Sequence, residues 1–371
     1  MAPSPPATCD EGAQPPSEGA LVSFIATSCA RAGLPAASPR RPDPEDYRMH
    51  LRHSCLAAVL ALVPAQLLAD PLPSWNDTDA KAAIIAFVEG VTDPASPDYV
   101  TPDARIATFD NDGTLWAEQP FYFQFLYALD RVREKGAADP SILTSDVLRA
   151  AAAGDLGPVL AAGEEGLLEV VAVSHSGMTV EAFQADVRDW LETARHPETG
   201  MRYDEMLYQP MLELLAYLRD EGFSTWITSG GGVHFIRAFA SEAYNIPPWQ
   251  VIGTRATVTY DEENRVLMKE AEIGFLDDKA GKPVGIDQQI GAVPILIGGN
   301  SDGDFAMLDY GSAQDGPFLG LIVHHTDADR EFAYDREGPV GKLNRGLDEG
   351  PGKGWLIIDM AEDWETVWPS E

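Results

Sequence analysis

The most informative segment of this chain is Arg105-Ile106-Ala107-Thr108-Phe109-Asp110-Asn111-Asp112-Gly113-Thr114. Residues 106–109 are apolar and β-prone, and they have the length of a buried strand. The carboxylates of Asp110 and Asp112 follow directly at its end. Burial of carboxylates is unfavourable unless a cation neutralises them, and a divalent ion with oxygen ligands is the simplest candidate. An ordinary Asx-rich turn is the alternative interpretation of these residues.

Downstream of this segment, strand-like apolar runs alternate with helical patterns. Further strands are expected at 223–228, 293–297, 319–324 and 355–358, and helices at 77–90, 210–221, 233–244 and 285–291. Residues 251–260 and 266–273 flank the turn-forming residues 261–264, which predicts a hairpin. Strands that alternate with helices predict an α/β fold with a doubly wound, Rossmann-like parallel sheet.

The region between the first two strands has no strong strand signal. Residues 120–135, 145–153 and 179–194 instead show helical spacing of apolar side chains. Thr179 supplies a helix start signal for the third of these segments. Because the region interrupts the alternation of strands and helices, we expect a helical cap at about 117–208, inserted after the strand at 106–109.

Two further polar clusters carry possible phosphate-binding groups. Ser229 to Gly232 is a Gly-rich turn between a predicted strand and a predicted helix, and backbone N–H groups there favour an anion. Lys279 and Lys282 lie in a loop, where a lysine could pair with both a phosphate and a carboxylate. Taken separately, the Gly-rich turn is a weak signal against a plain strand-to-helix loop, and lysines of this kind more often lie in a solvated surface loop.

The last cluster is Asn300, Asp302 and Asp304, which follow the predicted strand at 293–297. Their hard oxygen atoms suit Mg²⁺, although an acidic turn is the alternative in so acidic a chain. His324 and His325 are not expected to form a metal pair, because neighbouring residues on a strand point to opposite faces.

In this order, the four clusters resemble the motifs of haloacid dehalogenase superfamily hydrolases, particularly the phosphoserine phosphatase-like branch. Residues 110–114 match the first motif, residues 228–231 the second, Lys282 the third with Lys279 as runner-up, and residues 299–304 the fourth. The resemblance covers about 105–324. It departs from the family at Asn300, where the fourth motif usually has an aspartate, so that Asp302 or Asp304 could hold more of the metal.

The resemblance implies a Mg²⁺-dependent phosphatase that acts on a small phosphomonoester through an aspartyl-phosphate. Asp110 would be the nucleophile, Asp112 the general acid and base, and Lys282 the third catalytic residue. The implied substrate-binding residues are Ser229, Gly230, Asn111 and Gly113, and the implied metal ligands are Asp110, Asp112, Asn300 and Asp304. Phosphoserine is one candidate substrate, but Glu118, which could contact it, is better explained as a carboxylate at a helix start.

Two other functions stay open at this point. A non-catalytic phosphate- or metal-binding protein would be consistent with Asn300 in place of an aspartate. A hydrolase of carbon–halogen bonds is the second, although family members of that kind lack the aspartate found here at position 112.

The residues before the first predicted helix have a different character. Residues 1–48 are rich in Pro, Ala and Ser and are expected to be disordered or an untranslated extension. Met49 starts a short basic and then apolar run, so we expect a signal peptide over 49–69, a hydrolase domain over 70–371, and a periplasmic or secreted product. All three cysteines, Cys9, Cys29 and Cys55, precede residue 70.

The charge of the chain limits its partners. It has 59 acidic and 26 basic residues, with a formal net charge of −33. Nucleic acids and anionic membrane surfaces require basic patches, so neither is expected as a partner once the signal peptide is removed. A small-molecule phosphomonoester is the expected partner.

Overall fold

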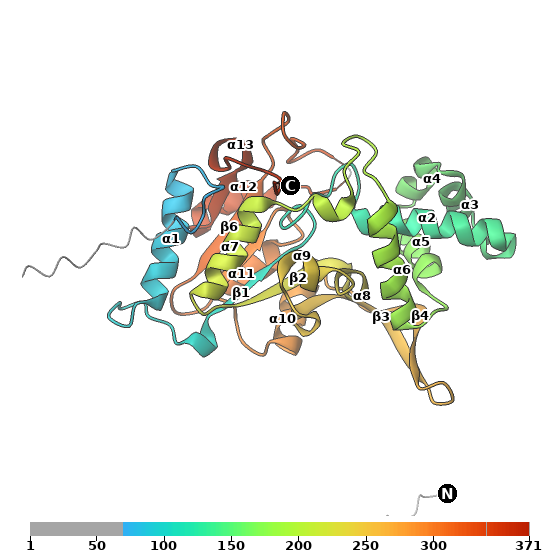
Figure 1. The fold of residues 1–371 in the computed structure, drawn as a ribbon, viewed down its shortest axis with the longest axis horizontal. Coiled ribbons are helices and arrows are strands. Elements are labelled where there is room, and N and C mark those ends of the chain that lie inside the picture. The colour runs from blue at the N-terminus through green and yellow to red at the C-terminus, as the bar shows by residue number, and fades with distance from the viewer. Residues whose placement is uncertain (1–69, 339, 371) are drawn as a thin grey trace, which may run out of the picture. The chain divides into compact units, whose positions relative to one another are not determined.

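The computed structural model describes residues 70–338 and 340–370, and Figure 1 shows how their elements are arranged. The predicted extension over 1–48 and the predicted signal peptide over 49–69 lie outside the described residues. Within the described ranges, no helix is long and apolar enough to cross a membrane.

One seven-stranded sheet forms the centre of the fold, with the strand order β4-β3-β2-β1-β5-β6-β7. All neighbouring strands are parallel except β3 and β4, which form the predicted antiparallel hairpin. The predicted α/β fold is therefore confirmed, with a sheet that is mostly rather than wholly parallel. The strands are β1 Ile106–Phe109, β2 Ser224–Gly232, β3 Val251–Asp261, β4 Val266–Phe275, β5 Leu296–Gly299, β6 Leu319–His324 and β7 Leu356–Asp359.

Helices cover the sheet and fill the region between β1 and β2 (Figure 1). The α-helices are α1 Asp79–Thr92, α2 Phe123–Ala138, α3 Asp146–Ala153, α4 Leu156–Ala161, α5 Gly163–His175, α6 Val180–Thr193, α7 Gln209–Asp220, α8 Val233–Ile236, α9 Ala240–Tyr244, α10 Gly281–Gln289, α11 Phe305–Ser312, α12 Arg345–Glu349 and α13 Met360–Asp363. Short 3-10 helices are η1 Pro102–Ala104, η2 Pro140–Ile142, η3 Tyr203–Glu205, η4 Pro248–Gln250 and η5 Pro351–Lys353.

Strand β1 is buried along its whole length because β2 and β5 pair with its two edges. Phe109 lies beside Ile227 on one side and Gly298 on the other. Thr108 and Thr228 share a buried hydroxyl–hydroxyl hydrogen bond of 2.7 Å across this pairing. The carboxyl ends of three parallel strands therefore meet at one edge of the sheet, which is where α/β folds bind ligands.

Several elements differ from the sequence prediction. Strand β2 continues to Gly232 instead of turning at Ser229, because its backbone keeps pairing with β3 through a register shift between Ser229 and Gly232. The helix predicted at 233–244 is divided into α8 and α9. The strand predicted at 293–297 is β5, which begins only at Leu296, after a proline at 294 that has no N–H group to donate.

The helices between β1 and β2 have a small core of their own. Apolar side chains of α2, α3, α4 and α5 pack together there: Phe125, Ala128, Leu129, Val132, Leu148, Ala151, Val159 and Val170. Helices α4 and α5 were not predicted as separate elements. The hairpin strand β4 also reaches this region, since its Lys269 exchanges backbone hydrogen bonds with Gly177 and Met178 at 3.0 and 2.9 Å.

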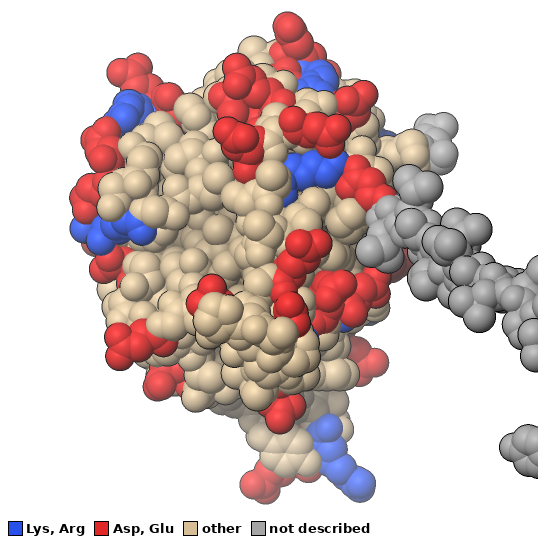
Figure 2. Space-filling model, turned by 90° about the vertical axis from the view of Figure 1, so that its left-hand side faces the viewer, with Lys and Arg blue, Asp and Glu red and all other residues tan. Residues whose placement is uncertain are grey.

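The surface carries the acidic excess of the sequence. On the face shown in Figure 2, Asp and Glu side chains outnumber Lys and Arg and are spread over the whole outline. Several of the ion pairs in which they take part are exposed on both sides, and such pairs contribute little to stability.

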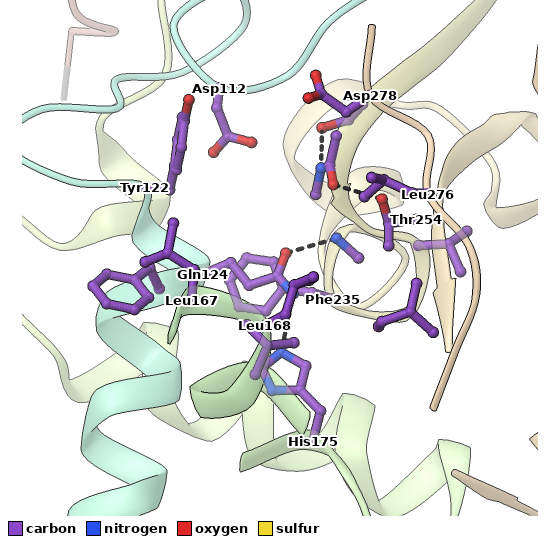
Figure 3. Close-up of a pocket in the computed structure, with 18 of the residues that line it drawn as sticks. Asp112, Tyr122, Gln124, Leu167, Leu168, His175, Phe235, Thr254, Leu276 and Asp278 are labelled. Atoms are coloured by element: carbon purple, nitrogen blue, oxygen red, sulfur yellow. Dashed lines mark hydrogen bonds between the residues drawn. The ribbon is translucent and has the colours of Figure 1, made fainter. Parts of the chain in front are cut away.

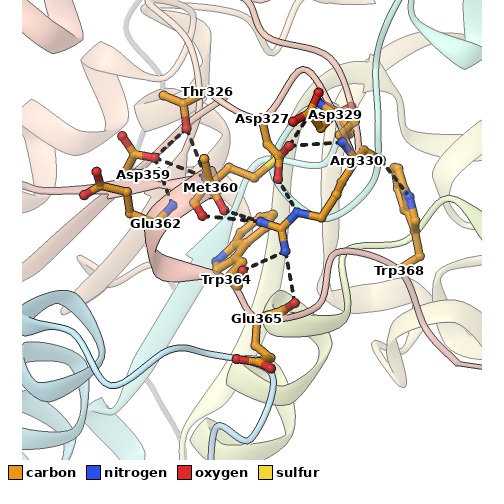
Figure 4. A network of polar contacts seen from close by, with 12 residues as sticks. Thr326, Asp327, Asp329, Arg330, Asp359, Met360, Glu362, Trp364, Glu365 and Trp368 are labelled. Atoms are coloured by element: carbon orange, nitrogen blue, oxygen red, sulfur yellow. Dashed lines mark hydrogen bonds and ion pairs between the residues drawn. The ribbon is translucent and has the colours of Figure 1, made fainter.

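The segment after β6 is held to the C-terminal residues by Arg330 (Figure 4). Its guanidinium donates to the carbonyl oxygens of Trp364 at 2.9 Å, Glu365 at 3.0 Å and Met360 at 3.2 Å, and it pairs with Asp327. One planar group thus satisfies several main-chain acceptors of the C-terminal segment.

We predict that Arg330→Met destabilises the fold by about 1–3 kcal/mol, because it leaves part-buried carbonyl groups without donors. Urea denaturation followed by tryptophan fluorescence would measure the loss. Arg336→Met is the matched control, because Arg336 pairs with Asp348 on the surface. Equal midpoints for the two variants would show that the Arg330 contacts do not stabilise the C-terminal segment.

Candidate active site

Lys282 connects three neighbouring strands of the sheet. Its ammonium group donates to Asp110 Oδ1 at 2.8 Å, to Asp304 Oδ1 at 2.6 Å and to the Thr228 carbonyl oxygen at 2.9 Å. Asp110 and Asp304 follow β1 and β5, Thr228 lies within β2, and Lys282 itself lies in the first turn of α10. Its side chain is only 2% exposed, so it is a buried cation among buried acceptors.

Asp304 is oriented by the loop that follows β5. Its Oδ2 atom accepts hydrogen bonds from the backbone N–H groups of Asn300 and Ser301 at 2.9 and 3.0 Å. The other oxygen is thereby directed at Lys282. Both oxygen atoms of Asp304 therefore have partners within the protein, and its main role in this geometry is to hold the lysine.

Asp110 lies at the end of β1, where its backbone N–H donates to the Gly298 carbonyl at 2.9 Å. Burial, reinforced by the charge of Asp304, raises the pKa of the Asp110 carboxyl to about 8 despite the opposing charge of Lys282. For Lys282, burial opposes the charge, but Asp110 and Asp304 raise the pKa above its ordinary value. In the described residues, Asp110 Oδ2 has no hydrogen-bond donor.

Asp112 faces the same cavity from two residues further along the chain. Its Oδ1 atom accepts a hydrogen bond from the Trp116 indole N–H at 2.9 Å, which fixes the orientation of the carboxylate. Burial raises the pKa of the Asp112 carboxyl above its usual value. A carboxyl group with a raised pKa in a cavity is suited to exchange protons with a ligand.

The residues after Thr228 form the opposite wall. Ser229 and Gly230 line the cavity, and Ser229 Oγ accepts the Gly231 N–H at 3.0 Å. A Cβ atom at Gly231 would lie 3.2 Å from Gln124 Oε1 and 3.5 Å from Asp112 Oδ2. The glycine therefore lets the backbone come close to the carboxylates. The long helix predicted after this segment is divided, and the four-residue α8 follows β2 directly.

Glu118 corrects the sequence interpretation. It is not at a helix start, because α2 begins at Phe123 and has no acidic residue in its first turn. Its side chain is instead 1% exposed and accepts hydrogen bonds from Asn300 Nδ2 at 2.7 Å and the Tyr334 hydroxyl at 2.8 Å. Burial raises its pKa well above the usual range. Glu118 also borders the cavity.

Asn300 is held next to the first motif loop. Its amide donates to Glu118, and its carbonyl oxygen accepts from the Thr114 hydroxyl at 3.3 Å. Gly113 has a φ of +74°, and a Cβ atom there would lie 2.0 Å from Asn300 Nδ2, so only glycine fits. The Gly113 carbonyl oxygen accepts from His325 Nε2 at 2.8 Å. The histidine thus supports the loop as a buried, packed residue.

Not all of the expected site residues reach the cavity. Asn111 is fully buried and does not line the cavity. Its backbone carbonyl oxygen accepts hydrogen bonds from the backbone N–H groups of residues 114–116. Asp302 accepts from the N–H groups of Asn344 and Gly346 and thereby anchors a distant loop. Lys279 borders the cavity with a 70% exposed side chain that pairs with Asp278 at 3.2 Å, whereas Lys282 is brought to Asp110.

The donor set can be tested against the expected Mg²⁺. Within the described residues, no three His, Cys, Asp or Glu side chains form a ready-made metal cage. Mg²⁺ nevertheless needs only one or two protein carboxylates, together with water and substrate phosphate. Asp110, Asp112 and Asp304 are buried carboxyl groups opposed by the single ammonium of Lys282. The raised pKa values of Asp110 and Asp112 mean that a further cation would be needed to keep both ionised, and this fits a divalent ion.

A cavity of about 490 Å³ extends from the carboxylates toward α5 and β4 (Figure 3). Sequence reasoning missed the residues that line this second part, including Gln124, His175, Phe183, His234, Lys269 and Leu276. They lie in helices and a hairpin whose patterns predict packing only. No motif marks them, because only the folded chain brings them together.

We predict that Lys282→Met lowers the unfolding free energy by about 3–5 kcal/mol, since it leaves Asp110 and Asp304 buried without their cation. Lys279→Met is the control with the same change of side chain at the surface. Urea midpoints that shift only for Lys282→Met would support this assignment. A shift of the same size in both variants would contradict it.

Comparisons with known proteins identify the family of this chain. The sequence profile of haloacid dehalogenase-like hydrolases matches residues 107–309. A functionally unknown protein from Anaerococcus prevotii DSM 20548 is similar in structure, with 17% identity over 74% of this chain and 98% of that chain and a TM-score of 0.48. A protein of unknown function from Bordetella pertussis Tohama I has 17% identity over 69% and 98%, with a TM-score of 0.42.

A third similar structure is a phosphoserine phosphohydrolase-like protein from Francisella tularensis subsp. tularensis SCHU S4. Its identity is 19% over 59% of this chain and 87% of that chain, and its TM-score is 0.33. The search of curated proteins found no match. The family profile covers more than half of the chain, including Asp110, Ser229, Lys282 and Asp304. The chain belongs to the haloacid dehalogenase-like hydrolase family.

Proposed function

We propose that this hydrolase is a Mg²⁺-dependent phosphatase that cleaves phosphomonoesters through an aspartyl-phosphate on Asp110. The observation that carries the proposal is the arrangement of Asp110, Asp112 and Lys282 at one cavity wall. Asp110 has one oxygen bonded to Lys282 and one without a donor in the described residues, and Asp112 lies two residues away in the same cavity. A nucleophile beside a proton donor is the arrangement that stepwise phosphoryl transfer requires.

The two aspartates would divide the reaction between them. An Asp110 oxygen forms a bond to phosphorus while the bond from phosphorus to the ester oxygen breaks. Asp112 gives its proton to the leaving alcohol oxygen, for which its raised pKa is favourable. Water then attacks the phosphorus atom, Asp112 takes its proton, and inorganic phosphate leaves with Asp110 restored.

Lys282 and the β2 end would bind the transferred group. The ammonium of Lys282 keeps Asp110 oriented and adds positive charge next to the position that the phosphoryl group would occupy. Ser229 and Gly230 border the same space, so they could bind phosphoryl oxygens. Together these groups would favour the charge that develops during transfer.

Asp110 and Asp112 are the residues that would hold Mg²⁺. When bound, the ion would neutralise phosphoryl oxygens and the surplus charge of the buried carboxylates. Asp304 is committed to Lys282, and the Asn300 amide to Glu118 and Thr114. We therefore assign these two residues of the expected ligand set to supporting roles.

The rival functions differ in what they require. A carbon–halogen hydrolase has no leaving alcohol to protonate, so it does not explain Asp112. A non-catalytic phosphate-binding protein would need neither an oriented nucleophile nor a proton donor. The presence of both favours turnover, and halide release from 2-haloacids would test the first rival.

We predict that the purified chain hydrolyses para-nitrophenyl phosphate with Mg²⁺, loses activity with a chelator, and regains it when Mg²⁺ is restored. Asp110→Asn should abolish activity, because no covalent intermediate can form. Release of para-nitrophenolate measures both results. Wild-type protein that binds phosphate without turnover would instead identify the non-catalytic function.

Asp112→Asn should fail differently. It keeps the nucleophile but removes the acid and base, which typically contributes about 10²–10⁴-fold. Alkyl phosphates, whose leaving groups need a proton, should lose more activity than para-nitrophenyl phosphate. Phosphate trapped on Asp110 in quenched samples, detected by mass spectrometry, would support this division. Equal losses on every substrate without trapped phosphate would contradict it.

We further propose that the chain is exported and that the mature protein starts near Asp70. The basic start at Met49 and the apolar run up to residue 69 support this proposal. Intact mass analysis of protein from the native cell would detect removal of the leader. Recovery of cytoplasmic protein that retains residues 49–69 would contradict it.

A further inference from the structure

The part of the cavity beyond Gln124 contains a buried cation that the chemistry described above does not use. Lys269 on β4 is 4% exposed, lines the cavity, and places its Nζ atom 4.5 Å from the centre of the Phe183 ring. Its only hydrogen-bond acceptor in the described part of the chain is His234 Nδ1, at 3.1 Å. An ammonium group has three donors, so two are left without an acceptor there.

No carboxylate compensates this charge. Among the described residues, Lys269 forms no ion pair, and the next residue, Glu270, is exposed and bonded to the Thr259 hydroxyl at 2.7 Å. Burial lowers the pKa of Lys269 to about 8, which leaves the ammonium mostly protonated at neutral pH. A buried charge without an opposite charge is unfavourable, and an anion from outside the protein would relieve it.

Lys269 is held in a fixed position, and the two imidazoles near it are neutral. Its backbone is bonded to Gly177 and Met178, so the side chain starts from a rigid position. Burial lowers the pKa of His234 to about 4 and that of His175 well below its usual range, with Lys269 contributing to both shifts. Both imidazoles are therefore uncharged at neutral pH, and Lys269 supplies the positive charge of this end.

Gln124 connects the two ends of the cavity. Its Oε1 atom accepts the Gly232 N–H at 2.7 Å, and its Nε2 atom lies 3.0 Å from His175 Nε2. In Figure 3, the Gln124 side chain lies between Asp112 and His175. The walls around it are largely apolar and are formed by Phe125, Leu167, Leu168, Val171, Phe183 and Leu276.

From this arrangement we propose that Lys269 binds a second anionic group on the substrate, at the end of the cavity opposite Asp110. The substrate class is a phosphomonoester whose alcohol part has an apolar body and ends in a carboxylate or a second phosphate. This inference rests on the proposed phosphatase function and specifies which class of phosphomonoester it would cleave. Phosphoserine lacks the apolar body and would leave the apolar walls without contacts.

Hydrolysis of matched substrates tests the proposal. A homologous series from butyl to octyl phosphate is compared with the same chains carrying a terminal carboxylate or a terminal phosphate. We expect at least one anionic series to show the higher kcat/KM. Lys269→Met should reduce that preference, the ratio of the two kcat/KM values, by about 10-fold or more, the effect expected for a lost hydrogen bond to a charged group.

Two further variants separate binding from packing. Lys269→Arg keeps the cation and should retain more of the preference than Lys269→Met. Lys353→Met, at a lysine that pairs with Asp309 outside the cavity, should leave the ratio unchanged. Equal losses on neutral and anionic substrates in Lys269→Met, or no preference in the wild type, would overturn the proposal. The anionic series whose preference is reduced in Lys269→Met shows whether the second anionic group is a carboxylate or a phosphate.

A binding measurement keeps this inference separate from the proposed function. Calorimetry with octanoate and with 1-octanol needs no turnover. Octanoate should bind the wild-type chain more tightly than 1-octanol, and Lys269→Met should remove the difference. If no phosphomonoester is hydrolysed but this difference is found, the phosphatase function fails while the anion site stands. If hydrolysis is found without this difference, and neither anionic substrate series shows a preference that depends on Lys269, the anion site fails.

Discussion

The three hydrogen bonds of Lys282 are the interaction on which the rest of the site depends. They connect the residues that follow β1 and β5 with Thr228 in β2 through one buried ammonium group. Because parallel strands bring their carboxyl ends to one edge, the acidic residues that follow them would repel one another there without a cation. The lysine in the first turn of α10 thus makes it possible to place several carboxylates together in a buried position.

The sequence predicted the strands around Lys282 because each of them follows from a pattern within a short segment. Strands β1 and β6 have the predicted bounds, and the hairpin of β3 and β4 follows from its turn residues. The choice of Lys282 over Lys279 came from the resemblance, and the structure brings Lys282 to Asp110. The predicted ends of elements were less accurate. Strand β2 stays extended through its glycines because it pairs with β3, and a pattern within β2 alone does not show this pairing.

The second part of the cavity could not be predicted either, because it too depends on contacts between segments that are distant in sequence. Lys269 stands in a β-strand whose polar residues look solvated, and only the docking of β4 against the segment between α5 and α6 buries it. Glu118 was misassigned because its partners, Asn300 and Tyr334, are 182 and 216 residues away. Contacts of that range leave no periodicity or spacing in a single sequence.

The acidic surface in Figure 2 has a kinetic consequence for a substrate with two negative groups. A chain with a net charge of −33 repels such a molecule before it reaches Lys269 or Lys282. Dissolved ions screen this repulsion, over a Debye length of about 10 Å at 0.1 M. Capture of the substrate should therefore become faster as salt is added, the reverse of the behaviour of enzymes that attract their substrates electrostatically. A saline environment would favour this enzyme.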